Sequence, residues 1–170
     1  TKAAARLEGS KAFAKTFMKT HSIPTAEFRV FTEAERYDAE RYIHEIPAPL
    51  VLKADGLAAG KGVTVCETKE MALEVLTTMM ETKLFGEGGR SVVIEECLVG
   101  EEASIFAITD GTEFVTLAPA QDHKRIFDND LGRNTGGMGA YAPAPVVSDA
   151  LMERVRREII RPTLRGMAAE

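Results

Sequence analysis

The amino-acid sequence predicts an α+β fold, because short β-branched runs alternate with helical patterns and tight turns. The apolar runs "LVLK" (50–53) and "GVTVC" (62–66) flank a glycine-rich stretch, as the two strands of a hairpin do. Thr68 is expected to cap a helix, because apolar side chains recur at helical spacing after it, and Asp110-Gly111 is a strong signal for a second hairpin. We therefore expect a small α+β unit up to about residue 94, followed by the beginning of a second sheet.

The first helix is expected to begin after Ser10, whose side chain can cap it. Its aromatic residues then fall on one face. Residues 26–31 ("AEFRVF") have the pattern of a short strand. Thr32 and Glu35 have the spacing of a capping box, which predicts a helix that continues to about Ile43.

The middle of the chain is expected to contain further strands. Residues 54–61 form the tip of the first hairpin, and "SVVIEECL" (91–98) has the pattern of a strand. The run "ASIFAIT" (103–109) is apolar on both faces, which predicts a sheet that is covered on both sides. Residues 121–144 lack periodicity over a length that is typical of functional or disordered segments.

The two ends of the chain indicate a piece of a longer protein. The start, "TKAAARLEGSK", has no methionine and resembles the tail of a helix, and the stop at "LRGMAAE" has no closing turn signal. The last helix is expected to open at Ser148, and Pro162 is expected to kink or end it.

The composition is that of an ordinary globular protein, with 45% hydrophobic and 28% charged residues among 170. The net charge of -5 argues against general affinity for nucleic acid or anionic membrane, both of which favour basic patches. Cys66 and Cys97 have no metal-ligand spacing and indicate reduced thiols. No apolar stretch is long enough to span a bilayer. We expect a cytoplasmic protein with small-molecule partners.

The stretch "LVLKADGLAAGKGVTV" (50–65) is typical of a loop that holds phosphates. It is not a P-loop, because the segment from Gly56 to Gly60 is one residue short and Gly62 stands where Ser or Thr is needed. It is not a dinucleotide fingerprint either, because the glycine spacing differs and a strand follows. A hairpin tip that folds over phosphates remains, with Lys53 offsetting their charge. The alternative is a surface hairpin with a solvated lysine.

Two further clusters add polar groups. "VIEECLVGEE" places Glu95 and Glu96 at a strand end, where main-chain groups can pair with an adenine edge and a later carboxylate can accept ribose hydroxyls. "AQDHKRIFDNDLGRNTGGMGAYAPAP" concentrates charge at 122–125, and its residues 134–139 can form an anion-binding nest of backbone amides. The alternatives are a solvated acidic loop and a mobile polar loop, with His123 solvated.

The stretches "KADGLAAGKGV", "VIEECLVGEEAS", "AQDHKR" and "NTGGMGAYAPAP", in this order, resemble the glycinamide ribonucleotide synthetase (phosphoribosylamine–glycine ligase) family of ATP-grasp enzymes. With "LEGSKAFAKTFM" and "IPTAEF" the resemblance covers nearly the whole chain. It implies an ATP-grasp fold that grips ATP between two α+β subdomains. Residues 26–94 would be the lid (B) subdomain and 95–170 the first, truncated part of the A subdomain. Residues 1–25 would be a helix linking them to a missing N-terminal domain.

The resemblance also implies a role for individual residues. The residues implied to bind ATP are Lys11 and Lys53 at the phosphates, Ala59, Gly60, Lys61 and Gly62 in the lid loop, Glu95, Glu96, Cys97 and Leu98 at the adenine, and Glu102 at the ribose. The catalytic candidates, for contact with the transferred phosphate or the substrate, are Lys124 and Arg125. The implied substrate-binding residues are Asp122, His123, Asn134, Thr135, Gly136, Gly137, Met138 and Gly139.

The implied reaction moves the γ-phosphate of ATP to the carboxylate of glycine, and the amine of 5-phosphoribosylamine then attacks the acyl phosphate. It requires Mg²⁺ or Mn²⁺, and the family's metal ligands lie in a Glu-x-Asn motif on a later strand that this chain does not contain. The chain alone is therefore expected not to be a competent ligase. The alternatives are a non-catalytic nucleotide-binding module and another ATP-grasp carboxylate–amine ligase.

Overall fold

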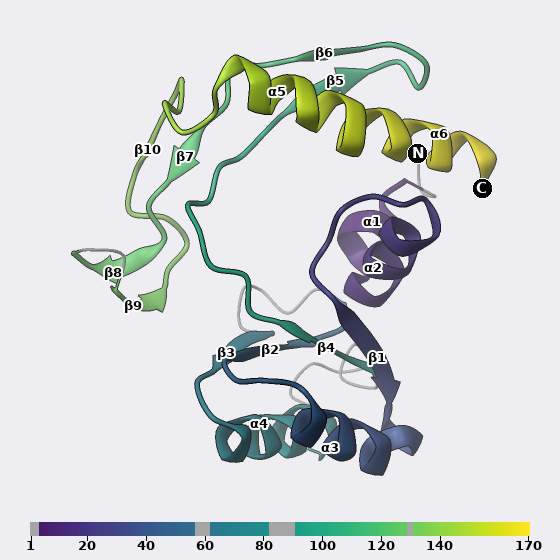
Figure 1. Ribbon diagram of the computed structural model, residues 1–170, viewed down its shortest axis with the longest axis vertical. Helices are drawn as coiled ribbons and strands as arrows, with labels where there is room; N and C mark the ends of the chain where they lie inside the picture. Colours follow the sequence, from purple (N-terminus) through teal and green to yellow (C-terminus); the bar gives the residue numbers. More distant parts are fainter. Residues whose placement is uncertain (1–3, 57–61, 82–90, 129–130) are drawn as a thin grey trace. The chain divides into compact units, whose positions relative to one another are not determined.

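A computed structural model describes residues 4–56, 62–81, 91–128 and 131–170 of the chain (Figure 1). The chain divides into two compact units, Thr1–Leu98 and Val99–Glu170. Helices and antiparallel strands occur in both units, which confirms the predicted α+β class.

The first unit is built on a four-stranded antiparallel sheet with helices on both faces. In spatial order its strands are β1 (Phe28–Thr32), β4 (Ser91–Glu96), β2 (Leu50–Ala54) and β3 (Val63–Cys66). Helices α3 (Arg36–Glu45) and α4 (Lys69–Glu81) lie on one face. Helix α2 (Lys11–Thr20), which follows the short α1 (Arg6–Gly9), lies on the other face (Figure 1).

Alternation along the central strands divides their side chains between the two faces. Leu52 and Ile94 are fully buried in the cluster that also contains Leu76 of α4. Burying a side chain of this size contributes about 1.5–3 kcal/mol relative to leaving it in water. Lys53 and Glu95, one position further along each strand, therefore point to the opposite face, the side that α2 covers.

Local sequence signals set the helix starts as predicted. The N–H of Phe13 donates to the Ser10 side chain at 3.0 Å, and the N–H of Met71 donates to Thr68 at 3.2 Å. The capping box of Thr32 and Glu35 is also present. It opens a 3-10 turn, η1 (Glu33–Glu35), before α3 begins, so the predicted single helix is a turn followed by a helix.

The predicted hairpin of the first unit is confirmed by the pairing of β2 with β3, from Leu50 opposite Cys66 to Lys53 opposite Val63. The strand predicted over 91–98 ends at Glu96.

The second unit contains the hairpin predicted around Asp110-Gly111, formed by β5 (Ala107–Thr109) and β6 (Phe114–Thr116). Gly111 has a φ of 102°, a conformation that other residues resist. The prediction that this sheet is covered on both sides is wrong for the part of the chain described, because Ile108 and Val115 are 60% and 62% exposed. An apolar pattern indicates that a strand can be buried on both faces. It does not indicate which segment of a protein would cover those faces.

Residues 121–144, whose sequence lacks periodicity, contain short strands that form two ladders among the described residues. The first ladder joins β7 (Gln121–Asp122) to β10 (Ala140–Tyr141), and the second joins β8 (Arg125–Phe127) to β9 (Leu131–Asn134). Strands of two to four residues are too short to give a visible period of two in the sequence.

The last helix begins at Ser148 as predicted, because the N–H of Leu151 donates to its side chain at 3.3 Å. The helix runs through α5 (Asp149–Val155), the π-helical η3 (Arg156–Ile160) and α6 (Arg161–Ala169). Pro162 does not end it. A wider π turn, in which the N–H of Arg161 donates to the carbonyl of Arg156, precedes the proline. The helix thereby continues past a residue that has no N–H to donate.

Candidate functional site

The glycine-rich hairpin tip begins and ends at described residues. Lys53 lies one residue before the end of β2, and the N–H of Ala54 donates to the carbonyl of Gly62 at 2.8 Å, which closes the base of the hairpin. Gly62 is buried. The other predicted loop residues, Ala59, Gly60 and Lys61, lie outside the described residues.

Lys53 and Glu95 form an ion pair across neighbouring strands. In the register of β2 and β4, Lys53 is opposite Val93 and Glu95 is opposite Val51, so the two charged residues are diagonal neighbours on one face. The side chain of Glu95 is 6% exposed, whereas that of Lys53 is 27% exposed. Glu95 therefore turns its carboxylate toward Lys53, inside the unit.

A second lysine, Lys15 of α2, contacts the same carboxylate. Its ammonium lies 2.6 Å from Oε2 of Glu95 and donates hydrogen bonds to Oγ1 of Thr25 at 2.6 Å and to the carbonyl of Ala26 at 3.1 Å. The contact with Oε2 is an ion pair without the alignment of a hydrogen bond. No motif in the sequence assigns Lys15 to the site. Its position on the same helix face as Lys11, Ala14 and Met18 is a sequence signal for a buried position.

The group of Lys15, Lys53 and Glu95 has more positive than negative charge. Two ammonium groups share one carboxylate, which leaves one unit of positive charge. In surroundings shielded from water, an uncompensated charge interacts more strongly with a counter-ion than it would in solvent. Because Lys53 is the more exposed lysine, this excess charge is available to an anion at the base of the glycine-rich hairpin.

The start of α2 is attached to the end of β2. The Ser10 hydroxyl donates to both carboxylate oxygens of Asp55, at 3.0 and 3.1 Å, and the N–H of Ala12 donates to Oδ1 at 3.1 Å. Lys11 donates to the carbonyl of Gly56 at 2.7 Å. The ammonium of Lys11 therefore lies at the first residue of the glycine-rich loop, close to the end of the strand that carries Lys53.

Of the residues predicted at the adenine, Glu95 lies inside β4 with its side chain in the ion pair with Lys53, whereas Glu96, Cys97 and Leu98 lie where β4 leaves the sheet. The N–H of Glu96 donates to the carbonyl of Glu27, and the Glu96 carboxylate accepts the N–H of Glu27, each at 3.0 Å. Cys97 and Leu98 come after the last ladder pair, and Leu98 is 69% exposed. Their main-chain groups therefore lie outside the ladder, where a ligand edge can reach them.

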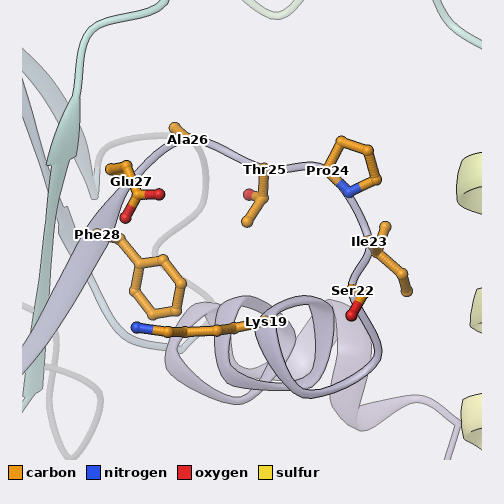
Figure 2. Close-up of a pocket in the computed structure, with 8 residues that line it drawn as sticks. All are labelled: Lys19, Ser22, Ile23, Pro24, Thr25, Ala26, Glu27 and Phe28. Atoms are coloured by element: carbon orange, nitrogen blue, oxygen red, sulfur yellow. The ribbon is translucent and has the colours of Figure 1, made fainter.

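A pocket of about 270 Å³ lies between the end of α2 and the segment that leads into β1 (Figure 2). Figure 2 shows the Lys19 side chain along the helix, beneath the ring of Phe28, with Thr25 and Ala26 in the segment above. The Lys19 ammonium lies 5.8 Å from the centroid of that ring. Of the residues predicted from sequence to bind a ligand, none lines this pocket.

In the second unit Lys124 is surrounded by carboxylates. Its ammonium forms an ion pair with Glu102 and lies 3.7 Å from Oδ2 of Asp122. The hydrogen bond to Glu102 raises the pKa of Lys124 above its ordinary value. The structure therefore brings together two residues predicted at different parts of the ligand, the ribose residue Glu102 and the catalytic candidate Lys124.

The segments "DHKR" and "NTGGMG" contact each other through their main chains. The N–H of Thr135 donates to the carbonyl of Lys124, and the N–H of Met138 donates to the carbonyl of His123, at 2.6 and 2.7 Å. The main-chain N–H of His123 donates to the carbonyl of Gly139. The ring centroid of His123 lies 5.6 Å from that of Tyr141.

The predicted nest of amides at 134–139 is partly occupied by the protein itself. Besides Thr135 and Met138, Gly137 uses its N–H, donating to Oγ1 of Thr135 at 3.1 Å. An anion would have to displace these acceptors or use the remaining amides, such as that of Gly136. The side chains of Arg125 and Asn134 lie outside the described part of the structure.

Metal and membrane sites were sought among the described residues. No group of three or more His, Cys, Asp or Glu side chains that could hold a metal ion occurs there. Within the same residues no helix is long and apolar enough to cross a bilayer.

The comparison with protein families gives one match over most of the chain. Residues 9–170 match the model of the phosphoribosylglycinamide synthetase ATP-grasp (A) domain. Curated phosphoribosylamine–glycine ligases from Pasteurella multocida and Escherichia coli K12 are 55% and 54% identical to the whole chain. The chain spans 39% of the length of these relatives.

Solved structures agree with this match. A phosphoribosylamine–glycine ligase from Thermotoga maritima superposes on 98% of the chain with a TM-score of 0.81 and 39% identity, and the chain covers 41% of it. A biotin carboxylase from Campylobacter jejuni has a TM-score of 0.78 at 17% identity, over 97% of this chain and 36% of its own, which shows the fold alone. The predicted ATP-grasp fold is thereby confirmed, and the chain belongs to the phosphoribosylglycinamide synthetase ATP-grasp family.

Proposed function

We propose that this chain is the ATP-binding portion of a ligase that joins glycine to 5-phosphoribosylamine. The observation that carries the proposal is the excess positive charge of Lys15 and Lys53 around Glu95, at the base of a glycine-rich hairpin. An accessible ammonium beside a loop that allows close main-chain approach is suited to a polyphosphate. The relatives that are named phosphoribosylamine–glycine ligase support the choice of substrates.

The reaction class explains why positive charge is needed. A carboxylate oxygen of glycine attacks the γ-phosphorus of ATP, and the bond to the bridging oxygen of ADP breaks with its electron pair on that oxygen. Both reactants are anions, so fixed cations must offset their repulsion and the charge of the transferring phosphoryl group. The amine of 5-phosphoribosylamine then attacks the acyl carbon, phosphate leaves, and the amine proton passes to solvent.

The residues of each unit have roles that follow from the contacts within that unit. In the first unit Lys53 and Lys11 contact the phosphates, and the main chain of Cys97 and Leu98, directly after Glu96, contacts the adenine. In the second unit Glu102 accepts the ribose hydroxyls and Lys124 contacts the substrate. These two side chains are paired with each other, so a ligand competes with the pair for the Lys124 ammonium and for Oε1 of Glu102.

The remaining expectations belong to the same proposal. Asp122, His123 and the 134–139 loop are the substrate-binding candidates, and residues 26–94 and 95–170 correspond to the lid and to part of the larger subdomain. Mg²⁺ supplies charge neutralisation on the phosphates when it is bound. The described residues bring no three carboxylate, imidazole or thiolate ligands together, so no step is assigned to a metal held by them.

The test is whether ADP formation by the intact protein requires both substrates. The proposal expects ADP release only when glycine and 5-phosphoribosylamine are both present. ADP formation that is indifferent to glycine would overturn it in favour of an ATP-grasp enzyme with another carboxylate. Tight ATP binding with no turnover under any combination would favour a nucleotide-binding module without chemistry.

A further inference from the structure

We propose that Lys15 is a positioning residue for ATP: it stays on Glu95 and keeps that carboxylate fixed when Lys53 moves to a phosphate. The inference rests on the proposed nucleotide site and adds a residue that the motifs did not assign. Three observations carry it: the contacts that hold the Lys15 ammonium, the accessibility of Lys53 and the burial of Glu95.

The ammonium of Lys15 is held by three groups of the protein. It donates hydrogen bonds to Thr25 at 2.6 Å and to the carbonyl of Ala26 at 3.1 Å, and it lies 2.6 Å from Oε2 of Glu95 as an ion pair. The residue is 7% exposed, and its ammonium also lies 5.1 Å from the centroid of the Phe28 ring. Lys15 is therefore held in place and cannot reach a ligand without giving up several contacts.

Lys53 has the opposite properties. It lies on a strand next to the hairpin tip, its side chain is 27% exposed, and it contacts the other carboxylate oxygen, Oε1 of Glu95. A phosphate oxygen can compete for this ammonium, because a polyphosphate carries more negative charge than one carboxylate. Of the two lysines on Glu95, Lys53 is the one that can exchange partners.

Glu95 explains why one lysine has to stay. Its side chain is 6% exposed, so after Lys53 leaves, its charge would be buried without compensation in the absence of Lys15. Lys15 meets that requirement. Lys15 also accounts for the excess positive charge that an anion can use. Without Lys15 the pair of Lys53 and Glu95 would be neutral, and Lys53 would be bound more firmly to the carboxylate.

The first test is Lys15→Met in the intact ligase, with steady-state kinetics in which ATP and glycine are varied separately. The expected result is a rise of about tenfold or more in the KM for ATP, with the KM for glycine changed by less than about twofold. A purely structural role would lower kcat and the melting temperature and leave the KM for ATP unchanged. That second outcome would overturn the inference.

Lys19→Met is the matched control, because Lys19 lies one helical turn further along α2 and is exposed (Figure 2). It removes a lysine from the same helix without touching Glu95, and the KM for ATP is expected to stay within about twofold of wild type. An equal rise in Lys15→Met and Lys19→Met would also overturn the inference, because any loss of positive charge from α2 would then suffice.

A second variant keeps the inference testable if Lys15→Met does not fold. Thr25→Val removes one acceptor of the Lys15 ammonium and keeps the shape of the side chain. We expect about a threefold higher KM for ATP, and an unchanged value overturns the inference. A wild-type protein that neither binds nor turns over ATP would instead overturn the proposed function, so the two failures are distinguishable.

Discussion

The ammonium of Lys15 lies 2.6 Å from Oε2 of Glu95, and both side chains are almost inaccessible to solvent. Buried ion pairs rarely increase stability over a well-packed apolar pair, because both charges lose their hydration. A second lysine, Lys53, contacts the same carboxylate and is more exposed, which favours a functional role for this arrangement over a purely structural one.

Lys53→Ala in the intact protein is expected to lower kcat/KM for ATP. The expected loss of transition-state stabilisation is about 2–4 kcal/mol, the scale of one preorganised electrostatic contact. The reason is the loss of the accessible ammonium beside the hairpin tip. Steady-state kinetics measure the effect. Lys69→Ala serves as control, because Lys69 donates to the carbonyl of His44 on the surface of the same unit. Equal activities of the two variants would make Lys53 an ordinary surface residue.

Asp55→Ala is expected to lower the free energy of unfolding by about 1–2 kcal/mol, as the loss of a helix cap does. Asp55 accepts hydrogen bonds from Ser10 and from the N–H of Ala12 at the start of α2. Urea unfolding followed by circular dichroism measures the change. Asp38→Ala, which removes an exposed ion pair with Arg41, should cost no more than about 0.5 kcal/mol. A smaller effect at Asp55 than at Asp38 would contradict the assigned contacts.

Cys66 gives a prediction about pH. Burial raises the pKa of its thiol to about 11, so the thiol stays protonated in the folded protein after it ionises in the unfolded chain. The unfolded state then binds fewer protons than the folded state between about pH 9 and 11, and stability falls as the pH rises through that range.

The measurement is the free energy of unfolding at pH 8 and at pH 10.5 in wild type and in Cys66→Ala. The decline is expected to be smaller in the variant by roughly 1–3 kcal/mol, since one pKa unit corresponds to about 1.4 kcal/mol. The difference between the two proteins removes the contribution of lysines and tyrosines, which titrate in the same range. Parallel curves would show that Cys66 is not protected from ionisation. Turnover should be unaffected at neutral pH.

Glu102→Gln tests the charged pair of the second unit. The hydrogen bond from Lys124 to Glu102 raises the pKa of the lysine, so the neutral amide should lower that pKa toward its ordinary value. Carbon-13 NMR titration of the Lys124 side chain measures it. If Glu102 also accepts the ribose hydroxyls, the KM for ATP rises in the same variant. An unchanged lysine titration would contradict the ion pair.

The sequence predicted those features that depend on local chemistry. The caps at Ser10, Thr68 and Ser148, the pairing of strands β2 and β3 and the turn at Gly111 follow from side chains and backbone preferences within a few residues. The segments "DHKR" and "NTGGMG" were both singled out, and the structure brings them together.

Features that depend on tertiary packing were missed or misjudged. A lysine is rarely buried, so Lys15 gave no functional signal until the register placed Glu95 on the face under α2. The apolar strand around Ile108 was expected to be buried on both faces, but Ile108 is exposed in the described part of the structure. Pro162 was expected to kink or end the helix, and only the structure shows a π turn before it.

The most direct test of the account is a crystal structure of the intact protein with a non-hydrolysable ATP analogue, in which the distance from Nζ of Lys53 to the nearest phosphate oxygen is measured. We predict hydrogen-bond contact, at about 2.7–3.2 Å, with Lys15 still on the carboxylate of Glu95. Phosphates bound away from the hairpin, with Lys53 still paired to Glu95, would contradict the account.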